Sequence, residues 1–203
     1  MSEPRTFPYE ARVVYLDNLY DRLEWSSLFH NPHPVHLDLG AGDGGYTAAM
    51  AVKHPEINFL GVERLKGRAI KIAKKSLRFN APNLKVMRLE SAYTVRWLVK
   101  ESSVEAMHLL FPDPWPKRKQ QKFRLVQPEF VMDVLKGLKS GGYFHFATDH
   151  EEYFEAGCAV LSANPGFQRI DDSPWGELPQ TDFERQWVAQ GKKIGRSFWK
   201  KKG

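Results

Sequence analysis

The sequence has very little cysteine: Cys158 is the single one among 203 residues. One cysteine cannot form an internal disulfide, which agrees with a reducing compartment, and its helical surroundings favour a buried small residue without a catalytic role. The seven histidines show no spacing with Cys158 that resembles a metal-ligand set. We therefore predict no disulfide framework and no catalytic metal.

Long apolar runs are missing as well. No stretch approaches the roughly 18 apolar residues of a transmembrane helix, and Met1–Glu10 has neither the basic start nor the apolar centre of a signal peptide. These absences predict a cytoplasmic protein with no membrane partner. At 203 residues and 42% hydrophobic composition, the chain is long enough for one well-buried core and short for two.

Acidic residues are fewer than basic ones: the sequence has 24 Asp and Glu and 30 Lys and Arg, which gives a net charge of +6. An excess of this size suits a polyanionic partner, although it also occurs in ordinary enzymes. The basic residues gather in three groups: Lys66, Arg68, Lys71, Lys74, Lys75 and Arg78; Lys117, Arg118, Lys119, Lys122 and Arg124; and Lys192, Lys193, Arg196, Lys200, Lys201 and Lys202. Such groups favour phosphate contacts. Solvated helix faces in the first group and a disordered tail in the third are the alternative.

Apolar segments of strand length alternate with segments of helical periodicity, which is typical of parallel βα units. Strands are expected at Val35–Leu39, Ile57–Val62, Leu84–Leu89, Val104–Leu110, Tyr143–Ala147, Phe167–Ile170 and Ile194–Trp199. Helices are expected at Gly44–Lys53, Leu65–Phe79, Ala92–Lys100, Pro128–Lys139 and Glu151–Ser162. We predict a single α/β domain with helices on both faces of a mostly parallel sheet.

The segments around these elements complete the expected organisation. Residues 1–33 form an N-terminal helical extension, with an amphipathic helix over Tyr9–Trp25, and residues 34–203 form the catalytic core. Gly141 and Gly142 are expected to end the fourth helix and start the fifth strand. Asp171–Gln180, rich in Pro, Gly and acidic residues, is interpreted as a loop beside the site.

A glycine-rich turn follows the first expected strand and opens a helix: Gly40, Gly42 and Gly44 lie in Gly-Ala-Gly-Asp-Gly-Gly. Glycines tolerate positive φ and have no Cβ, so this backbone can pass close to a bulky cofactor. Glu63 ends the second strand about 20 residues later, where a carboxylate can accept hydrogen bonds from both ribose hydroxyls. This geometry is shared by nicotinamide dinucleotide sites and S-adenosylmethionine sites.

Asp38 favours S-adenosylmethionine, because a carboxylate just before the turn would repel a pyrophosphate and attract the cationic amino-acid part of S-adenosylmethionine. The alternative for Asp38 is a turn or capping carboxylate. After the third strand, Ser91 could reach the adenine edge, or it could cap the next helix.

The stretch Phe111-Pro112-Asp113-Pro114-Trp115-Pro116-Lys117 leaves the carboxyl end of an apolar strand, where open α/β sheets bind ligands. Its prolines fix φ and push their predecessors toward extended geometry, so the backbone holds Asp113 in place. The alternative is a Pro-rich surface turn. Farther along the chain, Asp149 at the end of the fifth strand could contact a base or ribose, or act as a helix N-cap.

Together, these motifs closely resemble the bacterial tRNA (guanine-N7-)-methyltransferase family over nearly everything after Pro34. The motifs that carry the resemblance, in this order, are the glycine-rich loop, residues 111–117, Gln127-Pro128-Glu129-Phe130, Ala147-Thr148-Asp149 and Thr181-Asp182-Phe183-Glu184. The resemblance implies a seven-stranded Rossmann-like class I methyltransferase fold, with S-adenosyl-L-methionine as the methyl donor. It implies methylation at N7 of a guanine in tRNA, at position 46 of the variable loop, by a monomer or homodimer.

The resemblance also implies site residues. Its cofactor contacts fall on Asp38, Gly40, Gly42, Gly44, Glu63, Ser91 and Asp113, and its substrate contacts fall on Lys117, Asp149, Thr181, Asp182, Phe183 and Glu184. Several positions depart from the family pattern: Asp38 stands where glutamate is common, Ser91 replaces Asp or Asn, and Gln120, Gln121 and Phe123 occupy a stretch often richer in His and Arg.

The proposed chemistry needs placement more than a base, because guanine N7 has a free lone pair and no proton. We expect Asp113, the catalytic residue, to orient the guanine by accepting hydrogen bonds from its N1 and N2 groups. Trp115 and Phe111 could stack on an exposed base, although Phe111 could equally be a core aromatic that locks the loop. Glu184 would orient a basic side chain or accept from a base or ribose.

Three other functions remain possible on sequence alone. An NAD-dependent oxidoreductase would use the glycine loop and Glu63 but would leave the Asp113 loop unexplained. A non-catalytic RNA-binding protein on a methyltransferase scaffold would bind RNA without methyl transfer. A methyltransferase acting on exocyclic amines would form a different product.

Overall fold

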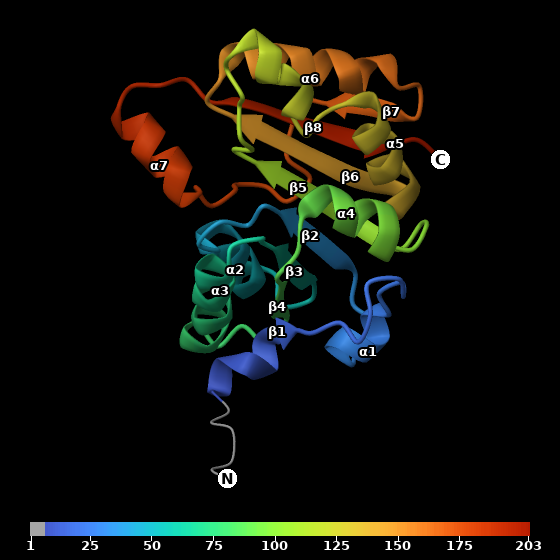
Figure 1. The fold of residues 1–203 in the computed structure, drawn as a ribbon, viewed down its shortest axis with the longest axis vertical. Helices are drawn as coiled ribbons and strands as arrows, with labels where there is room; N and C mark the ends of the chain where they lie inside the picture. The colour runs from blue at the N-terminus through green and yellow to red at the C-terminus, as the bar shows by residue number, and fades with distance from the viewer. Residues whose placement is uncertain (1–6) are drawn as a thin grey trace.

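The computed structural model describes residues 7–203 and contains a sheet of eight strands in the order β1-β4-β3-β2-β5-β6-β8-β7 (Figure 1). The strands are β1 (Val13–Val14), β2 (Val35–Leu39), β3 (Asn58–Val62), β4 (Leu84–Met87), β5 (Val104–Leu110), β6 (Leu138–Thr148), β7 (Phe167–Ile170) and β8 (Gly195–Lys201). β1 to β6 pair in parallel, whereas β8 is antiparallel to both of its neighbours, β6 and β7. The predicted Rossmann-like α/β class is confirmed, with one short strand more than the expected seven.

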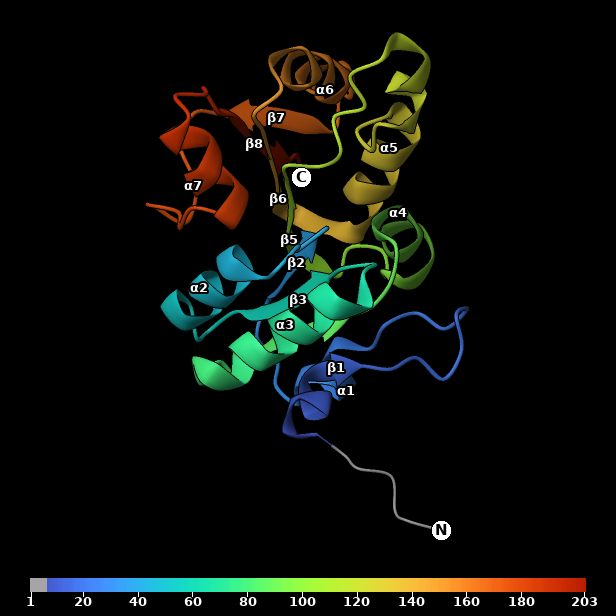
Figure 2. The same ribbon diagram turned by 60° about the vertical axis from the view of Figure 1, so that its left-hand side comes forward.

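Helices cover both faces of the sheet, as its fully buried central strands require. They are η1 (Pro8–Arg12), α1 (Trp25–Phe29), α2 (Gly45–Lys53), α3 (Lys66–Arg78), α4 (Ser91–Tyr93), η2 (Thr94–Leu98), η3 (Arg118–Phe123), α5 (Pro128–Gly137), α6 (Glu151–Ala163) and α7 (Asp182–Ala189). Figure 2 shows α2 and α3 on one face, and α4 and α5 on the other. Within residues 7–203, no helix is both long and apolar enough to cross a membrane.

Two apolar clusters fill the space on either side of the sheet. The larger one contains Leu37, Leu109 and Phe146 from the strands, together with side chains from α1, η2, α5 and α6. The smaller one lies under α2 and α3 and includes Met50, Phe59 and Ile72. Cys158 on α6 is half-buried and packs at the edge of the larger cluster.

The N-terminal segment is not the amphipathic helix that was expected over Tyr9–Trp25. It contains the short helix η1, then β1, whose β-branched Val13 and Val14 pair in parallel with Val86 and Met87 of β4. An irregular stretch follows up to α1. There the side chain of Asn18 accepts hydrogen bonds from the backbone N–H groups of Tyr20 and Asp21, which favours a turn over a helix.

The fourth long helix also ends earlier than the glycines suggested. α5 ends at Gly137 and β6 begins at Leu138, so Gly141 and Gly142 lie inside a strand. The pairing shifts there, because Val104 is opposite Leu138 while Ala106 is opposite Tyr143. Gly141 has φ of 75°, so this turn-forming pair makes a bulge within β6.

The strand order reverses between β2 and β5, the two central strands of the sheet. Chain connections from β2 go toward β3 and β4, and those from β5 go toward β6 on the other side. The loops after β2 and β5 therefore diverge at their carboxyl ends and leave a crevice between them. The glycine loop and the Asp113 loop both start there.

Candidate functional site

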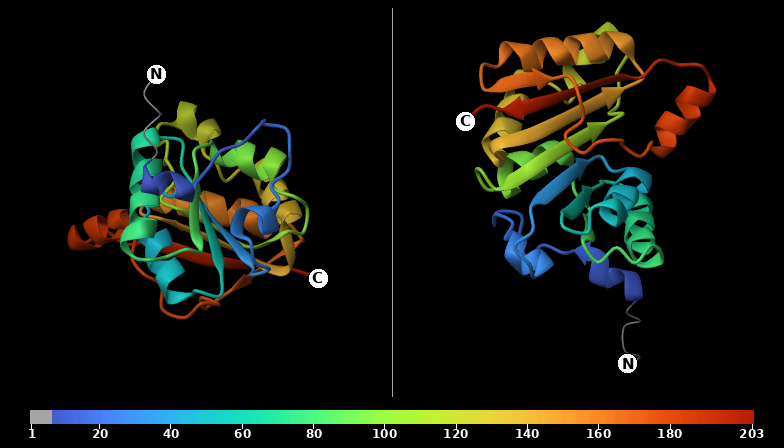
Figure 3. Two further views of the ribbon diagram at one scale, coloured as in Figure 1. Left: turned by 90° about the horizontal axis from the view of Figure 1, so that it is seen from below. Right: turned by 180° about the vertical axis from the view of Figure 1, so that it is seen from behind.

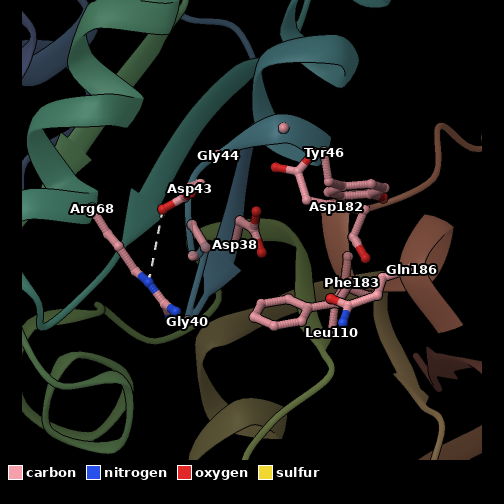
Figure 4. A pocket seen from close by; sticks show the side chains of 14 residues that line it. Asp38, Gly40, Asp43, Gly44, Tyr46, Arg68, Leu110, Asp182, Phe183 and Gln186 are labelled. Carbon is pink, nitrogen blue, oxygen red and sulfur yellow. Dashed lines mark ion pairs between the residues drawn. The ribbon is translucent and has the colours of Figure 1, made fainter.

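A pocket of about 230 Å³ lies between the glycine loop and the start of α7. Its lining includes Asp38, residues 40–46, Arg68, Leu110 and the stretch Thr181, Asp182, Phe183 and Gln186. Figure 4 shows Asp38 between the glycine loop and the side chains that α7 contributes. Residues separated by most of the chain thus form opposite walls of one cavity.

A second pocket of about 320 Å³ opens on the other side of Gly40. It is lined by Glu63, Arg64 and Ser91 from the ends of β3 and β4, and by Phe111, Asp113, Trp115 and Phe123 from the segment after β5. Gly40, Arg68, Leu110 and Phe183 border both pockets, so the two cavities adjoin. The structure therefore gathers most of the predicted cofactor residues around one continuous depression.

The glycine loop depends on backbone geometry that other residues rarely adopt. Gly40, Gly42 and Gly44 have φ of 77°, 58° and 73°. A Cβ on Gly44 would also lie 2.6 Å from Cγ1 of Ile72 on α3. Gly44 is therefore required both by its conformation and by the close approach of α3.

Glu63 is buried and stabilises the glycine loop by accepting a backbone hydrogen bond from it. Its Oε2 accepts a hydrogen bond from the Gly42 N–H at 3.0 Å, and its Oε1 accepts one from the Leu65 N–H at 2.8 Å. Each carboxylate oxygen retains a second lone pair, and the side chain borders the larger pocket. Glu63 can therefore support the loop and still accept a hydrogen bond from a ligand.

Asp38 is 3% exposed, at the end of β2, and its carboxylate accepts a hydrogen bond from the Thr47 hydroxyl. Burial raises the pKa of Asp38 from 3.8 to about 7; the Thr47 hydrogen bond opposes this rise, and the nearby Glu63 charge adds to it. A cation in the pocket would stabilise the ionised form.

The Asp113 loop has a strained backbone. Phe111 and Trp115, which precede Pro112 and Pro116, have φ of 53° and 43°, values that bulky residues rarely adopt. The extended geometry expected for residues before these prolines was therefore wrong at both positions. The loop is held at its start by the Phe111 N–H, which donates to the Ala147 carbonyl at 2.7 Å. Phe111 and Trp115 are half-buried, whereas Asp113 is exposed at the pocket rim, with its Oδ2 3.9 Å from Arg64 Nη2.

Arg124 holds the same loop from behind. Its Nε donates to the Pro114 carbonyl at 2.8 Å, and its two Nη atoms contact the Glu152 carboxylate on α6. The side chain is 4% exposed, and Glu152 raises the pKa of this guanidinium. Arg124 was expected among the phosphate-binding residues; this interpretation was wrong, because its donors are used inside the protein.

The neighbourhood of Ser91 also differs from one expectation. Glu90, not Ser91, is the N-cap of α4, and its side chain accepts from the backbone N–H groups of Ala92 and Tyr93. Ser91 is the first residue of the helix and lines the larger pocket. The capping alternative for Ser91 was therefore wrong.

The stretch Thr181–Glu184 starts α7, a helix that the sequence patterns did not predict. Thr181 is the N-cap, with its hydroxyl accepting from the Glu184 N–H at 2.8 Å. Asp182 lies against the start of α2, since a Cβ on Gly45 would be 2.8 Å from its Oδ2. Phe183 lies between the pockets, while Glu184 is buried and forms an ion pair with Arg196 at 2.7 Å. Glu184 thus orients a basic side chain, one of the roles expected for it.

Lys117 and Asp149 line neither of the two pockets. Lys117 is exposed at the start of η3, beside the Asp113 loop. Asp149 forms an ion pair with Lys192 at 3.0 Å, and His150 rather than Asp149 is the N-cap of α6. The capping alternative for Asp149 was wrong.

The third basic group is partly internal rather than a free tail. Arg196, Lys200 and Lys201 belong to β8, and Lys201 donates to the Leu138 carbonyl at 2.7 Å. The disordered-tail alternative is therefore wrong for these residues. Arg64 is an exposed cation beside Asp113, and the Asp113 loop is followed directly in the chain by the exposed cations of η3: Arg118, Lys119 and Lys122.

Sequence reasoning missed several residues around the site. Tyr46 lines the smaller pocket and was not expected there. Arg68, expected only as a member of the first basic group, also lines this pocket, contacts Asp43 at 3.7 Å and lies over the Phe183 ring (Figure 4). Trp175, in the expected loop after β7, packs on buried histidines beneath the site. Tyr46 could have been predicted to lie near the site from its position directly after the glycine loop. The residues around Trp175 in the sequence gave no indication that it packs on the buried histidines. Within residues 7–203, no group of three His, Cys, Asp or Glu side chains is arranged to hold a metal ion.

Comparisons with known proteins agree on the class of enzyme. A family model described as "Putative methyltransferase" matches residues 32–197. A tRNA (guanine-N(7)-)-methyltransferase of Aliivibrio salmonicida is 35% identical over 192 residues, covering 91% of this chain and 78% of that protein. The enzyme with the same name from Neisseria meningitidis serogroup C is 34% identical over 194 residues, covering 94% and 76%.

Solved structures with a similar fold are more distant in sequence. The 16S rRNA methyltransferase KamB has a TM-score of 0.63 and 19% identity, with 87% of this chain and 91% of that chain covered. A 16S rRNA (adenine(1408)-N(1))-methyltransferase from Catenulisporales acidiphilia has a TM-score of 0.60 and 14% identity, with 88% and 90% covered. These two similarities concern the fold alone.

Proposed function

The chain belongs to the tRNA (guanine-N7-)-methyltransferase family, and from this premise we propose that it methylates N7 of a guanine in tRNA. The observation that carries the proposal is the arrangement of the two adjoining pockets. One is bordered by the buried Asp38, and the other has Asp113 at its rim. One cavity system can therefore receive a cationic cofactor and a base side by side.

The residues around the pockets fit S-adenosyl-L-methionine. Asp38 is a buried carboxylate whose pKa is raised to about 7, chiefly by burial, so an ammonium or sulfonium cation would complement its ionised form. Gly40, Gly42 and Gly44 add no side chain to the loop, and nothing lies within 4 Å of where a Cβ on Gly40 would be. Glu63 retains lone pairs toward the larger pocket.

We assign Asp38 and the loop Gly40, Gly42 and Gly44 to the amino-acid part of the cofactor. Glu63 would accept from its ribose hydroxyls, and Ser91 would lie at its adenine edge. When bound, S-adenosyl-L-methionine supplies an electrophilic methyl group on a sulfonium. The chain's own contribution is to bind this group against the glycine loop and to leave the side facing Asp113 open to a base.

Asp113 would act on the guanine. Its side chain is 73% exposed at the pocket rim and is held there by a loop with two positive-φ residues and the Arg124 hydrogen bond. An ionised carboxylate can accept from the N1 and N2 groups of guanine and so place the N7 lone pair. It also stabilises the positive charge that the ring acquires on methylation. No residue has to remove a proton from N7, because that atom carries none.

Aromatic and basic residues around the rim would receive the RNA. Phe123 is 57% exposed and its ring centroid lies 5.4 Å from that of Trp115, which gives the rim an exposed aromatic surface. Stacking of an unpaired base on such a surface is worth roughly 1–3 kcal/mol. Lys117 and the cations of η3 are exposed beside it and would contact phosphates. Asp149 and the start of α7 would complete the tRNA contacts.

The test is methyl transfer from labelled S-adenosyl-L-methionine to unmodified tRNA transcripts, followed by nucleoside analysis. We expect 7-methylguanosine in the variable loop, at position 46, and its loss with Asp113→Ala, a substitution that should leave the fold intact. Asp17→Ala is a control, because this exposed aspartate lines neither pocket. Tight tRNA binding without transfer would instead support a non-catalytic RNA-binding protein. An N-methylated exocyclic amine would refute N7 as the target.

A further inference from the structure

Three histidines lie buried side by side on the face of the sheet that α2 and α7 flank. His36, His108 and His145 come from β2, β5 and β6, and all three are 0% exposed. His108 Nε2 lies 3.2 Å from His36 Nδ1, and His108 Nδ1 lies 3.2 Å from His145 Nδ1. The parallel register explains this contact, because His108 is opposite His145 in the β5–β6 pairing. The methyl-transfer proposal assigns these rings no role.

The row of histidines continues to α7 through Arg196 of β8. Arg196 Nη1 lies 2.8 Å from His145 Nε2, and its Nη2 donates to Glu184 Oε1 at 2.7 Å. The arginine side chain is 23% exposed and that of Glu184 is 11% exposed. An ion pair this well covered is less screened than a surface pair. Glu184 is thereby joined to the centre of the sheet.

Arg196 gives this hydrogen-bond chain a direction, because a guanidinium can only donate. His145 Nε2 must then accept, so its proton is on Nδ1, and that N–H donates to His108 Nδ1. His108 in turn carries its proton on Nε2 and donates to His36 Nδ1. This puts the His36 proton on Nε2, a buried atom that has no hydrogen-bond partner within residues 7–203. Burial keeps the rings neutral, since it lowers the pKa of His36 to about 3 and lowers the pKa of His108 and His145 well below the usual value.

The chain of hydrogen bonds connects both walls of the smaller pocket. Tyr46 lines one wall from α2, and its hydroxyl lies 3.1 Å from His108 Nδ1, where it shares the single acceptor lone pair with the His145 N–H. Glu184 is on α7, one residue after Phe183, which lines the other wall. Trp175 covers the rings, with its centroid 4.8 Å from that of His108. Figure 3, in its view from behind, shows the segment after β7 crossing this face of the sheet toward α7.

We propose that Arg196, His145 and His108 are positioning residues, which hold α7 at a fixed distance from the glycine loop and so set the shape of the cofactor pocket. Glu184 belongs to this set, and its buried carboxylate acts through Arg196 rather than on the base. This inference rests on the proposed function, because it names the residues that shape the site for that cofactor.

Polar residues suit this task better than apolar ones. Apolar side chains could fill the same space, but they would allow α7 to shift with little penalty. Each hydrogen bond in a buried network instead specifies one partner and one distance, and breaking it leaves a buried group unsatisfied. Glu184 is also the one buried residue of α7, at 8% exposure, so this ion pair is the contact of the helix that lies deepest in the protein.

The test compares Arg196→Lys with Arg169→Lys. Arg169 lies on β7, where it stacks over Trp199 with 5.8 Å to the ring centroid, so the control changes an arginine of the neighbouring strand. A lysine at 196 keeps the charge but cannot reach both Glu184 and His145 with the planar fork. We expect the Kd of S-adenosylhomocysteine, measured by calorimetry, to rise by roughly ten-fold or more in Arg196→Lys and to be unchanged in Arg169→Lys. In turnover assays, KM for the methyl donor should rise more than kcat falls.

A second measurement does not depend on any variant folding. Long-range ¹H–¹⁵N NMR spectra of the parent protein should show His145 protonated on Nδ1, and His108 and His36 protonated on Nε2. A different pattern of tautomers, or an unchanged Kd in a folded Arg196→Lys variant, would overturn the inference. If the parent protein itself does not bind S-adenosylhomocysteine, the proposed function fails, and this outcome is distinct from failure of the positioning role.

Discussion

Asp38 should make cofactor binding depend on pH near neutrality. Its pKa is raised from 3.8 to about 7 in the free protein. This difference of about three pH units corresponds to roughly 4 kcal/mol by which the folded protein disfavours the ionised carboxyl. A cationic ligand binds best to the carboxylate, so the protein must release the Asp38 proton when it binds below pH 7.

The size of the effect follows from the ionised fraction of Asp38. With a pKa of about 7, roughly 9% of the carboxyl is ionised at pH 6 and roughly 76% at pH 7.5, so affinity should rise roughly eight-fold between them. The buried histidines stay neutral over this range, because burial lowers the pKa of His36, His108 and His145. They do not contribute to the slope.

Calorimetry with S-adenosylhomocysteine at pH 6, 6.5, 7 and 7.5, in buffers of different ionisation enthalpy, measures both affinity and proton release. About half a proton should leave at pH 7. Asp38→Asn should bind S-adenosylhomocysteine weakly at every pH with no proton release. Asp43→Asn should show the same change of affinity with pH as the parent, because Asp43 already has Lys71 and Arg68 as ionic partners. An affinity of the parent that does not change with pH would refute the reasoning.

The same carboxyl should affect folding stability in the opposite direction: raising the pH strengthens cofactor binding but lowers the free energy of unfolding of the free protein. The folded chain binds the Asp38 proton more tightly than the unfolded chain does, so this contribution to stability is complete below about pH 4 and is lost as pH rises through about 7. Saturating ligand should remove this loss. Urea denaturation of the parent and of Asp38→Asn across this range gives the free energy of unfolding at each pH. The difference between the two proteins in how this free energy changes with pH is the contribution of Asp38.

Three further substitutions test the rim, the glycine loop and the support of the Asp113 loop. Phe123→Ala should raise KM for tRNA by roughly ten-fold without changing cofactor affinity, whereas Phe79→Ala, which also removes an exposed phenylalanine stacked with a basic neighbour, should change neither; equal effects would exclude stacking on Phe123. Gly44→Ala should lower the free energy of unfolding by about 2 kcal/mol or more, because the backbone at this position has positive φ and the added Cβ would collide with Ile72 of α3; an unchanged urea midpoint would contradict this. Arg124→Lys should lower kcat with little change in cofactor Kd, since the carbonyl that it holds belongs to the loop bearing Asp113; parent-like kcat would show that the loop keeps its shape without the guanidinium.

Much of the fold could be predicted because its central elements are specified locally. β2, β5 and β7 have the predicted bounds, since each is a short strand-like segment that begins and ends with an apolar residue and is followed by turn residues. The prediction of an N-terminal helix was wrong because Val13 and Val14 pair with β4 at the edge of the sheet. The local sequence pattern does not show that this edge is available. The bulge at Gly141 was missed for the same kind of reason: a glycine pair has the same sequence whether it ends a helix or bends a strand.

Capping and charge were the least predictable features of the site. Ser91 and Asp149 were each plausible caps, but a neighbouring residue, Glu90 or His150, has the cap geometry. Arg124 looked like its exposed basic neighbours, and only the approach of α6 turns it inward to Glu152. A side chain's partner depends on which segment lies opposite, and that segment can be far away in the sequence.

The sequence alone determined the chemistry of this protein: a glycine turn at the end of a strand, acidic residues at the ends of neighbouring strands, and an aspartate among prolines. These features are local, because backbone φ preferences and the order of strands and loops act over a few residues. Tertiary structure alone decided how the site is held together. Arg196, His145, His108 and Tyr46 meet because four separate segments pack at one place, and their hydrogen bonds exist only in that packing.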